Sequence, residues 1–146
     1  MPADERAARA LLGSHFSWTR YRERMVELLE SALRFDDPEY LAVLAFAGSD
    51  YELVGLTLFG TVAGAQAVVK VHAVVSREHA VALALLEAVR DASERSGERM
   101  IVCELPDDEP FARVADALMT AGYAEEGRVP DFIRDGIALR LLVRAP

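Results

Sequence analysis

The chain contains few cysteine and histidine residues, and this scarcity excludes several kinds of site. Its one cysteine, Cys103, rules out an internal disulfide and argues against a cysteine-based metal site. The cysteine lies in the apolar run MIVCEL, which favours a buried structural thiol over a nucleophile. The three histidines, at positions 15, 72 and 79, are widely separated and show no metal-ligand spacing. No metal site is therefore predicted.

Basic charge is also scarce, which limits the partners that the chain can take. Sixteen basic residues stand against twenty-four acidic ones, and the net charge is −8. Such a field repels nucleic acid and anionic membrane surfaces, and no cluster of Lys or Arg reverses it locally. We therefore expect neither as a partner. The acidic balance favours a cationic or amine partner, although it can also serve solubility alone.

Long apolar runs are absent as well. No uninterrupted apolar span approaches the length of a membrane helix, and the N-terminal stretch MPADERAARALL is too charged for a signal peptide. The expected location is the cytoplasm. Hydrophobic residues make up 52% and charged residues 27% of the 146 positions, a globular balance. Without repeats or low-complexity linkers, residues 1–146 are predicted to form one domain.

The pattern along the chain predicts a helical region over about residues 1–39. Residues 4–12 form a short helical pattern ended by Gly13, and Ser17 is a plausible N-cap for a longer helix that runs to about Phe35. From residue 40 onward the pattern changes to strands. Two segments, 40–48 and 52–60, are joined by turn residues and followed by a third strand, AQAVVKVHAVV. These three form an antiparallel meander.

After the meander, a helix and a further strand are predicted to cross over. Ser76 can cap a helix over about residues 77–96, which Gly97 ends, and RMIVCEL then forms a buried strand. A helix-sized connection implies that this strand lies parallel to the third one. A helix beginning near Pro110 and a hairpin over residues 127–144 complete the order. The predicted class is α+β, in the sense of a mixed α/β order.

Four stretches in this order resemble the GNAT superfamily of acyl-CoA-dependent N-acyltransferases. They are LVGLTLFG, the run REHAVALALL from Arg77 to Leu86, CELPDDEPFARVADALMTAGY and VPDFIRDGIALRLLVR. The resemblance covers about residue 40 to the C-terminus, and the helical residues 17–35 match the family's first helical region. It implies a central, mostly antiparallel sheet with one splayed parallel strand pair and helices on both faces. An unrelated α+β domain would lack that splay.

The resemblance also implies a site for the acyl-CoA. The family signature, Q/R-x-x-G-x-G/A, aligns with Arg77, Ala80 and Ala82, and Ala80 stands where the family usually has glycine. The strand before the signature would pair with pantetheine, and the helix N-terminus would receive the diphosphate. The cofactor-binding residues implied in this way are Val74, Val75, Arg77, Ala80, Val81 and Ala82. Acetyl-CoA or another acyl-CoA is the implied co-substrate.

Two residues are candidates for the catalytic base. Glu104 ends the strand RMIVCEL near the expected gap, but its pKa would need raising by burial, and a solvated residue or salt-bridge partner is the alternative. His72 lies inside the third strand. Its side chain either faces the acceptor cleft or is a structural histidine held by a hydrogen bond. The family often places an acidic Tyr four residues before the glycine of its last helix. Leu118 occupies that position here, and Tyr123 is expected to be a core aromatic.

Other conspicuous side chains have plainer interpretations. Asp131 and Asp135 in VPDFIRDG are expected to form turns. Phe16 and Trp18 either line an acceptor pocket or pack in the core.

Two functional hypotheses follow from the resemblance. The first is an N-acyltransferase that transfers an acetyl or acyl group from acyl-CoA to an amine of a small molecule or protein. The second is a GNAT-fold protein without turnover that acts as a CoA-binding, ligand-binding or interaction module. Either could form a homodimer, for which the apolar strand IALRLLV would be suitable.

Overall fold

The computed structural model describes residues 2–15, 19–34 and 40–146. The elements follow in the order α1 (Pro2–His15), α2 (Thr19–Arg34), β1 (Tyr40–Ala47), β2 (Glu52–Thr61), β3 (Val68–Ser76), α3 (His79–Arg95), β4 (Met100–Pro106), the 3₁₀ helix η1 (Glu109–Phe111), α4 (Ala112–Thr120), β5 (Ala124–Arg134) and β6 (Ile137–Arg144). This order confirms the predicted α+β class.

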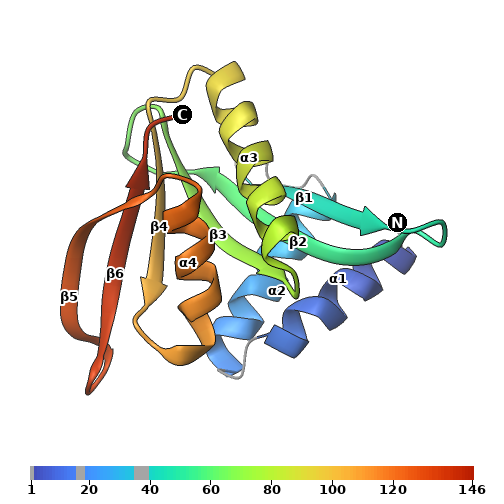
Figure 1. The fold of residues 1–146 in the computed structure, drawn as a ribbon, viewed down its shortest axis with the longest axis horizontal. Helices are drawn as coiled ribbons and strands as arrows, with labels where there is room; N and C mark the ends of the chain where they lie inside the picture. The colour runs from blue at the N-terminus through green and yellow to red at the C-terminus, as the bar shows by residue number, and fades with distance from the viewer. Residues whose placement is uncertain (1, 16–18, 35–39) are drawn as a thin grey trace.

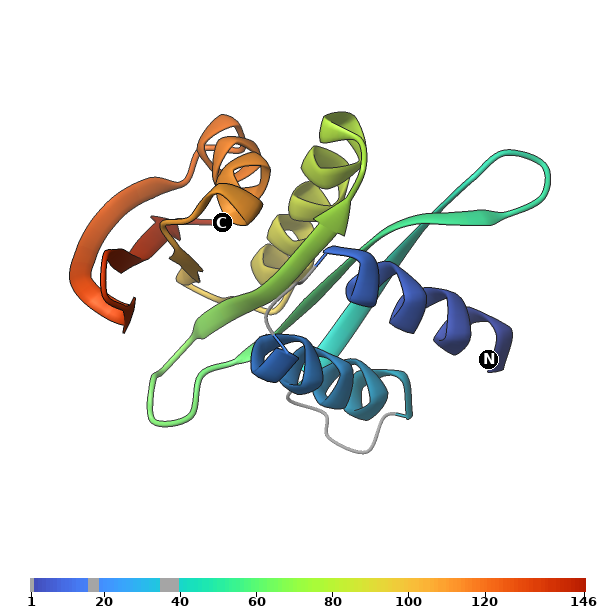
Figure 2. The ribbon, with the colours of Figure 1, turned by 90° about the horizontal axis from the view of Figure 1, so that it is seen from below.

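The strands form one mixed sheet with the order β1-β2-β3-β4-β6-β5 (Figure 1). Every neighbouring pair is antiparallel except β3 and β4, which run parallel. Viewed along the sheet, α3 and α4 cover one face and α1 and α2 the other (Figure 2). The predicted arrangement of one parallel pair and helices on both faces is confirmed.

The parallel pair separates along its length. β3 and β4 pair from Val68 and Met100 only as far as Val71 and Cys103. Both strands then continue, β3 to Ser76 and β4 to Pro106, without pairing to each other. The sheet is therefore divided by a wedge that is closed at the start of β4 and open at its carboxyl end. We call the last paired residues the apex of the wedge.

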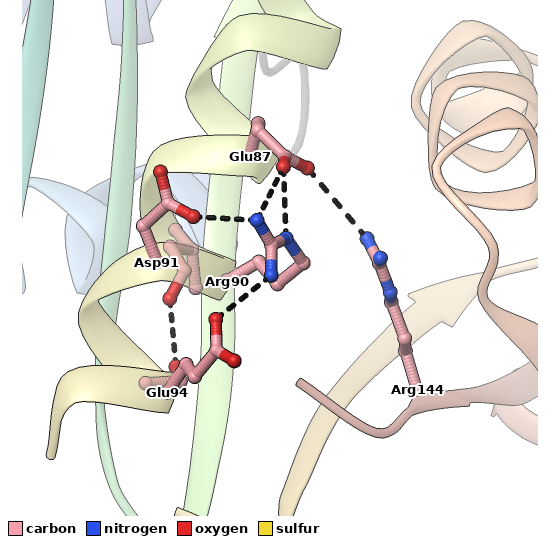
Figure 3. A network of polar contacts seen from close by, with 7 residues as sticks. Glu87, Arg90, Asp91, Glu94 and Arg144 are labelled. Atoms are coloured by element: carbon pink, nitrogen blue, oxygen red, sulfur yellow. Dashed lines mark hydrogen bonds and ion pairs between the residues drawn. The ribbon is translucent and has the colours of Figure 1, made fainter.

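A polar network lies at the closed end of the wedge (Figure 3). Arg144 of β6, which is opposite Ile101 at the start of β4, approaches Glu87 of α3 with an N–O distance of 3.9 Å. The hydrogen bond with Glu87 raises the pKa of the Arg90 guanidinium, which also pairs with Asp91 and Glu94. These side chains are partly exposed, so each pair contributes little to stability. They link α3 to the half of the sheet beyond β4.

A β-bulge lies in β3 at the apex. The register with β2 passes from Leu58 opposite Ala73 to Phe59 opposite Val71, so His72 is an extra residue with no partner position. A bulge breaks the alternation of a strand and redirects the side chains on one side of it. The residues of β3 after His72 therefore face the other way from what simple alternation predicts.

Helix boundaries differ from those predicted at two places. α1 continues through Gly13 to His15, and the φ of this glycine is not positive, so it does not end the helix as a C-cap residue would. α3 begins at His79 with Glu78 as its N-cap, two residues later than predicted. Ser76 does accept an N–H, at 3.1 Å, but from Glu78 before the helix starts. The predicted N-cap Ser17 lies outside the described residues.

The strand IALRLLV, now β6, lies inside the sheet. It pairs with β4 on one side and β5 on the other. It therefore offers no free edge to a second copy of the chain, and the edge strands of the sheet are β1 and β5.

The core occupies both faces of the sheet. Fully buried leucines come from α1, α2, β2, α3, α4 and β6, and they include Leu12, Leu29, Leu56, Leu86, Leu118 and Leu142. Within the described ranges, no helix has the length and apolar character needed to cross a membrane.

Candidate functional site

Two cavities lie beside the open end of the wedge. The first, the α3–α4 cavity, has a volume of about 320 Å³ and lies on the face covered by α3 and α4. It is lined by the end of β3, the start of α3 and the first turns of α4: Val74, Ser76, Arg77, Glu78, His79, Ala82, Arg113, Val114 and Asp116. This volume falls in the range of small-molecule sites.

Three of the six residues predicted to bind the cofactor line this cavity together: Val74, Arg77 and Ala82. The other three do not. The Val75 side chain is completely buried in the core. Ala80 is exposed in the first turn of α3, outside the cavity lining. Val81 is half-buried against β2, so its side chain is directed away from the cavity.

The N-terminus of α3 supplies backbone donors next to the cavity. The first helical hydrogen bond runs from the Ala82 N–H to the Glu78 carbonyl, at 3.1 Å. The N–H groups of the three residues between them therefore have no intrahelical acceptor. Such groups, with the helix dipole, favour an anion. Arg77 and Arg113 strengthen this preference, whereas the carboxylates of Glu78 and Asp116 oppose it.

The second cavity, the α2–hairpin cavity, has a volume of about 580 Å³. It reaches the face covered by α2 and is lined by Arg24, Met25, Lys70, Val71, His72, Glu104, Pro106, Phe132, Ile133 and Leu139. Both predicted catalytic residues, Glu104 and His72, therefore lie in one cavity. Because Lys70, His72 and Glu104 adjoin the last paired residues of β3 and β4, this cavity meets the wedge at its apex.

Glu104 is not buried. Its side chain is 43% exposed, and its Oε2 lies 3.0 Å from the Lys70 Nζ. The burial that we expected of a general base at this position is absent. The structure instead shows the salt-bridge alternative, an ion pair that spans β3 and β4 at the apex.

His72 is neutral at pH 7. Burial, followed by the charges of Lys70 and Arg24, lowers the pKa of its imidazole to about 4, while the charge of Glu104 opposes this shift. An imidazole with this pKa is a weak base, but it can accept or donate a hydrogen bond without carrying charge.

The depressed pKa of His72 predicts a stability that depends on pH. In the unfolded chain a histidine takes up its proton near pH 6.5, whereas the folded chain does so only near pH 4, so stability falls as the pH drops between these values. The full difference corresponds to about 3 kcal/mol, which partial exposure reduces to about 1–2 kcal/mol. His72→Gln should lose that much less stability between pH 7 and pH 4.5 in urea unfolding.

The matched control for this measurement is His79→Gln, which removes an exposed imidazole at the start of α3. Equal losses of stability in His72→Gln and the unmodified chain would contradict the assignment.

Leu118, Tyr123 and Cys103 line neither cavity. Leu118 is completely buried in the core. Tyr123 is 3% exposed, burial raises its pKa, and no described group hydrogen-bonds its hydroxyl. Burial also raises the pKa of Cys103 to about 12, which suits a structural thiol.

The remaining predictions concern turns and metal. Asp135 lies in the turn between β5 and β6, as predicted. Asp131 lies within β5 with a φ of 55°, and its carboxylate accepts a hydrogen bond of 2.7 Å from the Gly136 N–H of that turn. Phe16 and Trp18 lie outside the described residues. In the part of the chain that is described, no three His, Cys, Asp or Glu residues gather as metal ligands would.

Three lysine or arginine residues that line the cavities have no counterpart in the sequence-based prediction. Arg113 is the only basic residue between Arg99 and Arg128. A single arginine on the exposed face of a helix is only weak evidence for a binding site. Lys70 is the only lysine of the chain and lies two positions before His72. Arg24 belongs to a helix with several arginines, and nothing in the sequence distinguishes it.

No family model and no curated protein sequence matches the chain. Solved structures do match it over nearly its full length. A protein of the GNAT acetyltransferase family from Desulfovibrio desulfuricans superposes with a TM-score of 0.86 at 20% identity, covering 99% of this chain and 94% of that one. The chain has the GNAT fold.

Two aminoglycoside 6'-N-acetyltransferases share this GNAT fold. The enzyme from Enterococcus faecium gives a TM-score of 0.77 at 18% identity, and another, in complex with coenzyme A, gives 0.75 at 16%. Each match covers 99% of this chain and 92% of the other. At these identities the likeness concerns the fold alone. The matched region includes α1 and α2, so the GNAT fold extends to the N-terminal helices.

Proposed function

We propose that the chain is an N-acyltransferase that uses acetyl-CoA or a related acyl-CoA and an amine acceptor. The observation that carries this proposal is the wedge between β3 and β4, which adjoins a cavity on each face of the sheet. Two reactants can enter such a wedge from opposite faces and meet inside it. The known GNAT acetyltransferases of the same fold support the choice of chemistry.

The pantetheine arm would pair with β3 in the open part of the wedge. The carbonyl of Ala73 points to β2, because it accepts a hydrogen bond of 2.9 Å from Thr57 Oγ1. Backbone groups of successive strand residues point to opposite edges, so those of Val74 point into the wedge. The backbone N–H and carbonyl of Val75, in turn, point to β2. The pairing role therefore falls to Val74 and not to Val75.

The diphosphate would lie at the N-terminus of α3. Arg77 and Arg113 flank that end of the helix in the α3–α4 cavity, and neither is in an ion pair with a described residue. Guanidinium groups form strong, often bidentate bonds with phosphate oxygens. Glu78 and Asp116 would weaken binding, which places the expected affinity below that of a purely cationic site.

The acceptor would occupy the α2–hairpin cavity. Its amine must lose a proton before it attacks the thioester. Glu104, although exposed and paired with Lys70, lies at the apex and would receive that proton, directly or through water. His72, being neutral, would orient the acceptor or a water molecule by a hydrogen bond. The co-substrate supplies the activated acyl group.

A second function is favoured by two observations. The α3–α4 cavity contains as many carboxylates as guanidinium groups. Leu118 has no acidic proton and Tyr123 is buried in the core, so neither can protonate a leaving thiolate. Both features suit a GNAT-fold protein that binds CoA or another ligand without turnover.

Calorimetric titration and a thiol-release assay distinguish the two functions. We expect acetyl-CoA and free CoA to bind with one site per chain, and the thiol to be released when an amine acceptor is added. Binding without thiol release across a broad amine panel would support the module without turnover. If acetyl-CoA, longer acyl-CoAs and free CoA all fail to bind, both functions that involve CoA are wrong.

A further inference from the structure

The α2–hairpin cavity combines charges of both signs with apolar walls. We propose that its acceptor is a zwitterionic amino acid with an apolar side chain, and not a simple amine or a polycation. This inference rests on the proposed function, since it names the acceptor of the same site.

The charges at the apex match a zwitterion. Lys70 of β3 and Glu104 of β4 form their ion pair beside the last paired residues, Val71 and Cys103. An amino acid placed along this pair puts its ammonium group beside Glu104 and its carboxylate beside Lys70. The four charges then alternate in sign, so every neighbouring pair attracts. A simple amine would satisfy Glu104 but leave the Lys70 ammonium without a second anion.

A second cation favours the carboxylate further. Arg24 of α2 lines the cavity, whereas its ion-pair partner Glu27, at 3.2 Å, does not. The charged groups that line the cavity are thus two cations and one carboxylate, in a chain whose net charge is −8. The cations also dominate at His72, where Lys70 and Arg24 lower the pKa more than Glu104 raises it.

The rest of the lining suits an apolar side chain. Met25 of α2 and Leu139 of β6 contribute aliphatic surface, and Phe132 of β5 is 63% exposed at the rim. A volume of about 580 Å³ is ample for a single amino acid. A polycationic acceptor, by contrast, would bring further ammonium groups close to Arg24 and Lys70 and would be repelled.

The transfer balances with the residues present. The acceptor ammonium loses two protons, one to Glu104 or water and one to the departing thiolate. An amide bond forms between the acceptor nitrogen and the acyl carbon, and the carbon–sulfur bond breaks. The acceptor carboxylate stays beside Lys70 and Arg24 throughout.

The test compares three ligands that differ only in the carboxylate. L-phenylalanine, L-phenylalaninamide and phenethylamine are titrated into the full chain in the presence of free CoA, with spermidine as the polycation. We expect L-phenylalanine to bind about tenfold more tightly than the amide or the amine, from the loss of charge-assisted hydrogen bonds. Spermidine should bind more weakly than any of them.

Two arginine variants in α2 test which side chain recognises the carboxylate of the ligand. Arg24→Gln should weaken L-phenylalanine binding by about tenfold and leave phenethylamine unaffected. Arg22→Gln is the matched control, because Arg22 lines a different cavity with residues of α1. It should leave both ligands unchanged.

The outcomes separate this inference from the proposed function. If the amide, the amine or spermidine binds as tightly as L-phenylalanine, or if Arg24→Gln has no effect, the zwitterion proposal is wrong whether or not CoA binds. If free CoA fails to bind but L-phenylalanine binds with the expected preference, the cavity assignment holds and the acyltransferase does not.

Discussion

The double variant Arg77→Gln, Arg113→Gln will bind acetyl-CoA about a hundredfold more weakly than the unmodified chain, with each single variant losing about tenfold. Both guanidinium groups line the α3–α4 cavity from different elements, at the N-terminus of α3 and in the first turn of α4. Each would form charge-assisted hydrogen bonds with the diphosphate. Calorimetric titration at fixed ionic strength measures the effect.

Removing a negative charge from the same cavity tests whether the effect of charge on acetyl-CoA binding has the expected sign. Asp116→Asn removes a carboxylate from the same cavity and should tighten acetyl-CoA binding by several-fold. Arg95→Gln is the matched control, because this exposed arginine lies in the last turn of α3, far from the helix N-terminus. If Arg95→Gln weakens binding as much as Arg77→Gln does, the effect is one of net charge, and the assignment of the cavity fails.

Gly55→Ala will destabilise the folded chain by about 1–3 kcal/mol. A Cβ atom at this position would lie 2.8 Å from Val81 Cγ1, 3.0 Å from Leu85 Cδ1 and 3.1 Å from the Val75 carbonyl oxygen. Val81 is β-branched and cannot easily rotate away. The helix α3 must therefore move off β2 at its first turn, and we expect acetyl-CoA binding to weaken as well. Urea unfolding measures the loss of stability.

Two further variants test this explanation. Gly127→Ala places its Cβ no closer than 3.7 Å to a neighbouring side chain and should change stability by much less. Val81→Ala in the Gly55→Ala background removes the closest contact and should recover part of the lost stability. A double variant as unstable as the sum of the two single ones would show that the contact with Val81 is not the cause.

The order of the elements follows from local chemistry, and the sequence alone predicts it. The alternation of apolar residues from 40 to 75 gives the meander, and the helical period after Ser76 gives α3. The helix-sized connection then requires RMIVCEL to lie parallel to β3. Ends are less well predicted, since Gly13 lies within α1 and α3 starts at His79.

The candidate site is only partly encoded in local sequence. The resemblance to the GNAT superfamily implied a cofactor site at the end of β3 and the start of α3, and Val74, Arg77 and Ala82 of the implied residues line the cavity there. The bulge at His72 could not be predicted, because it arises from the register between β2 and β3. That bulge decides which residues of β3 direct their backbone groups into the wedge.

The sequence by itself determined the order of the strands and helices and the region in which α3 begins, because each depends on residues near one another in the chain. Only the tertiary structure decided that Arg113 joins Arg77 at one cavity and that Arg24 joins Lys70 and Glu104 at the other. These residues come from elements far apart in the sequence. Their meeting depends on how the helices pack across the divided sheet, which no local pattern specifies.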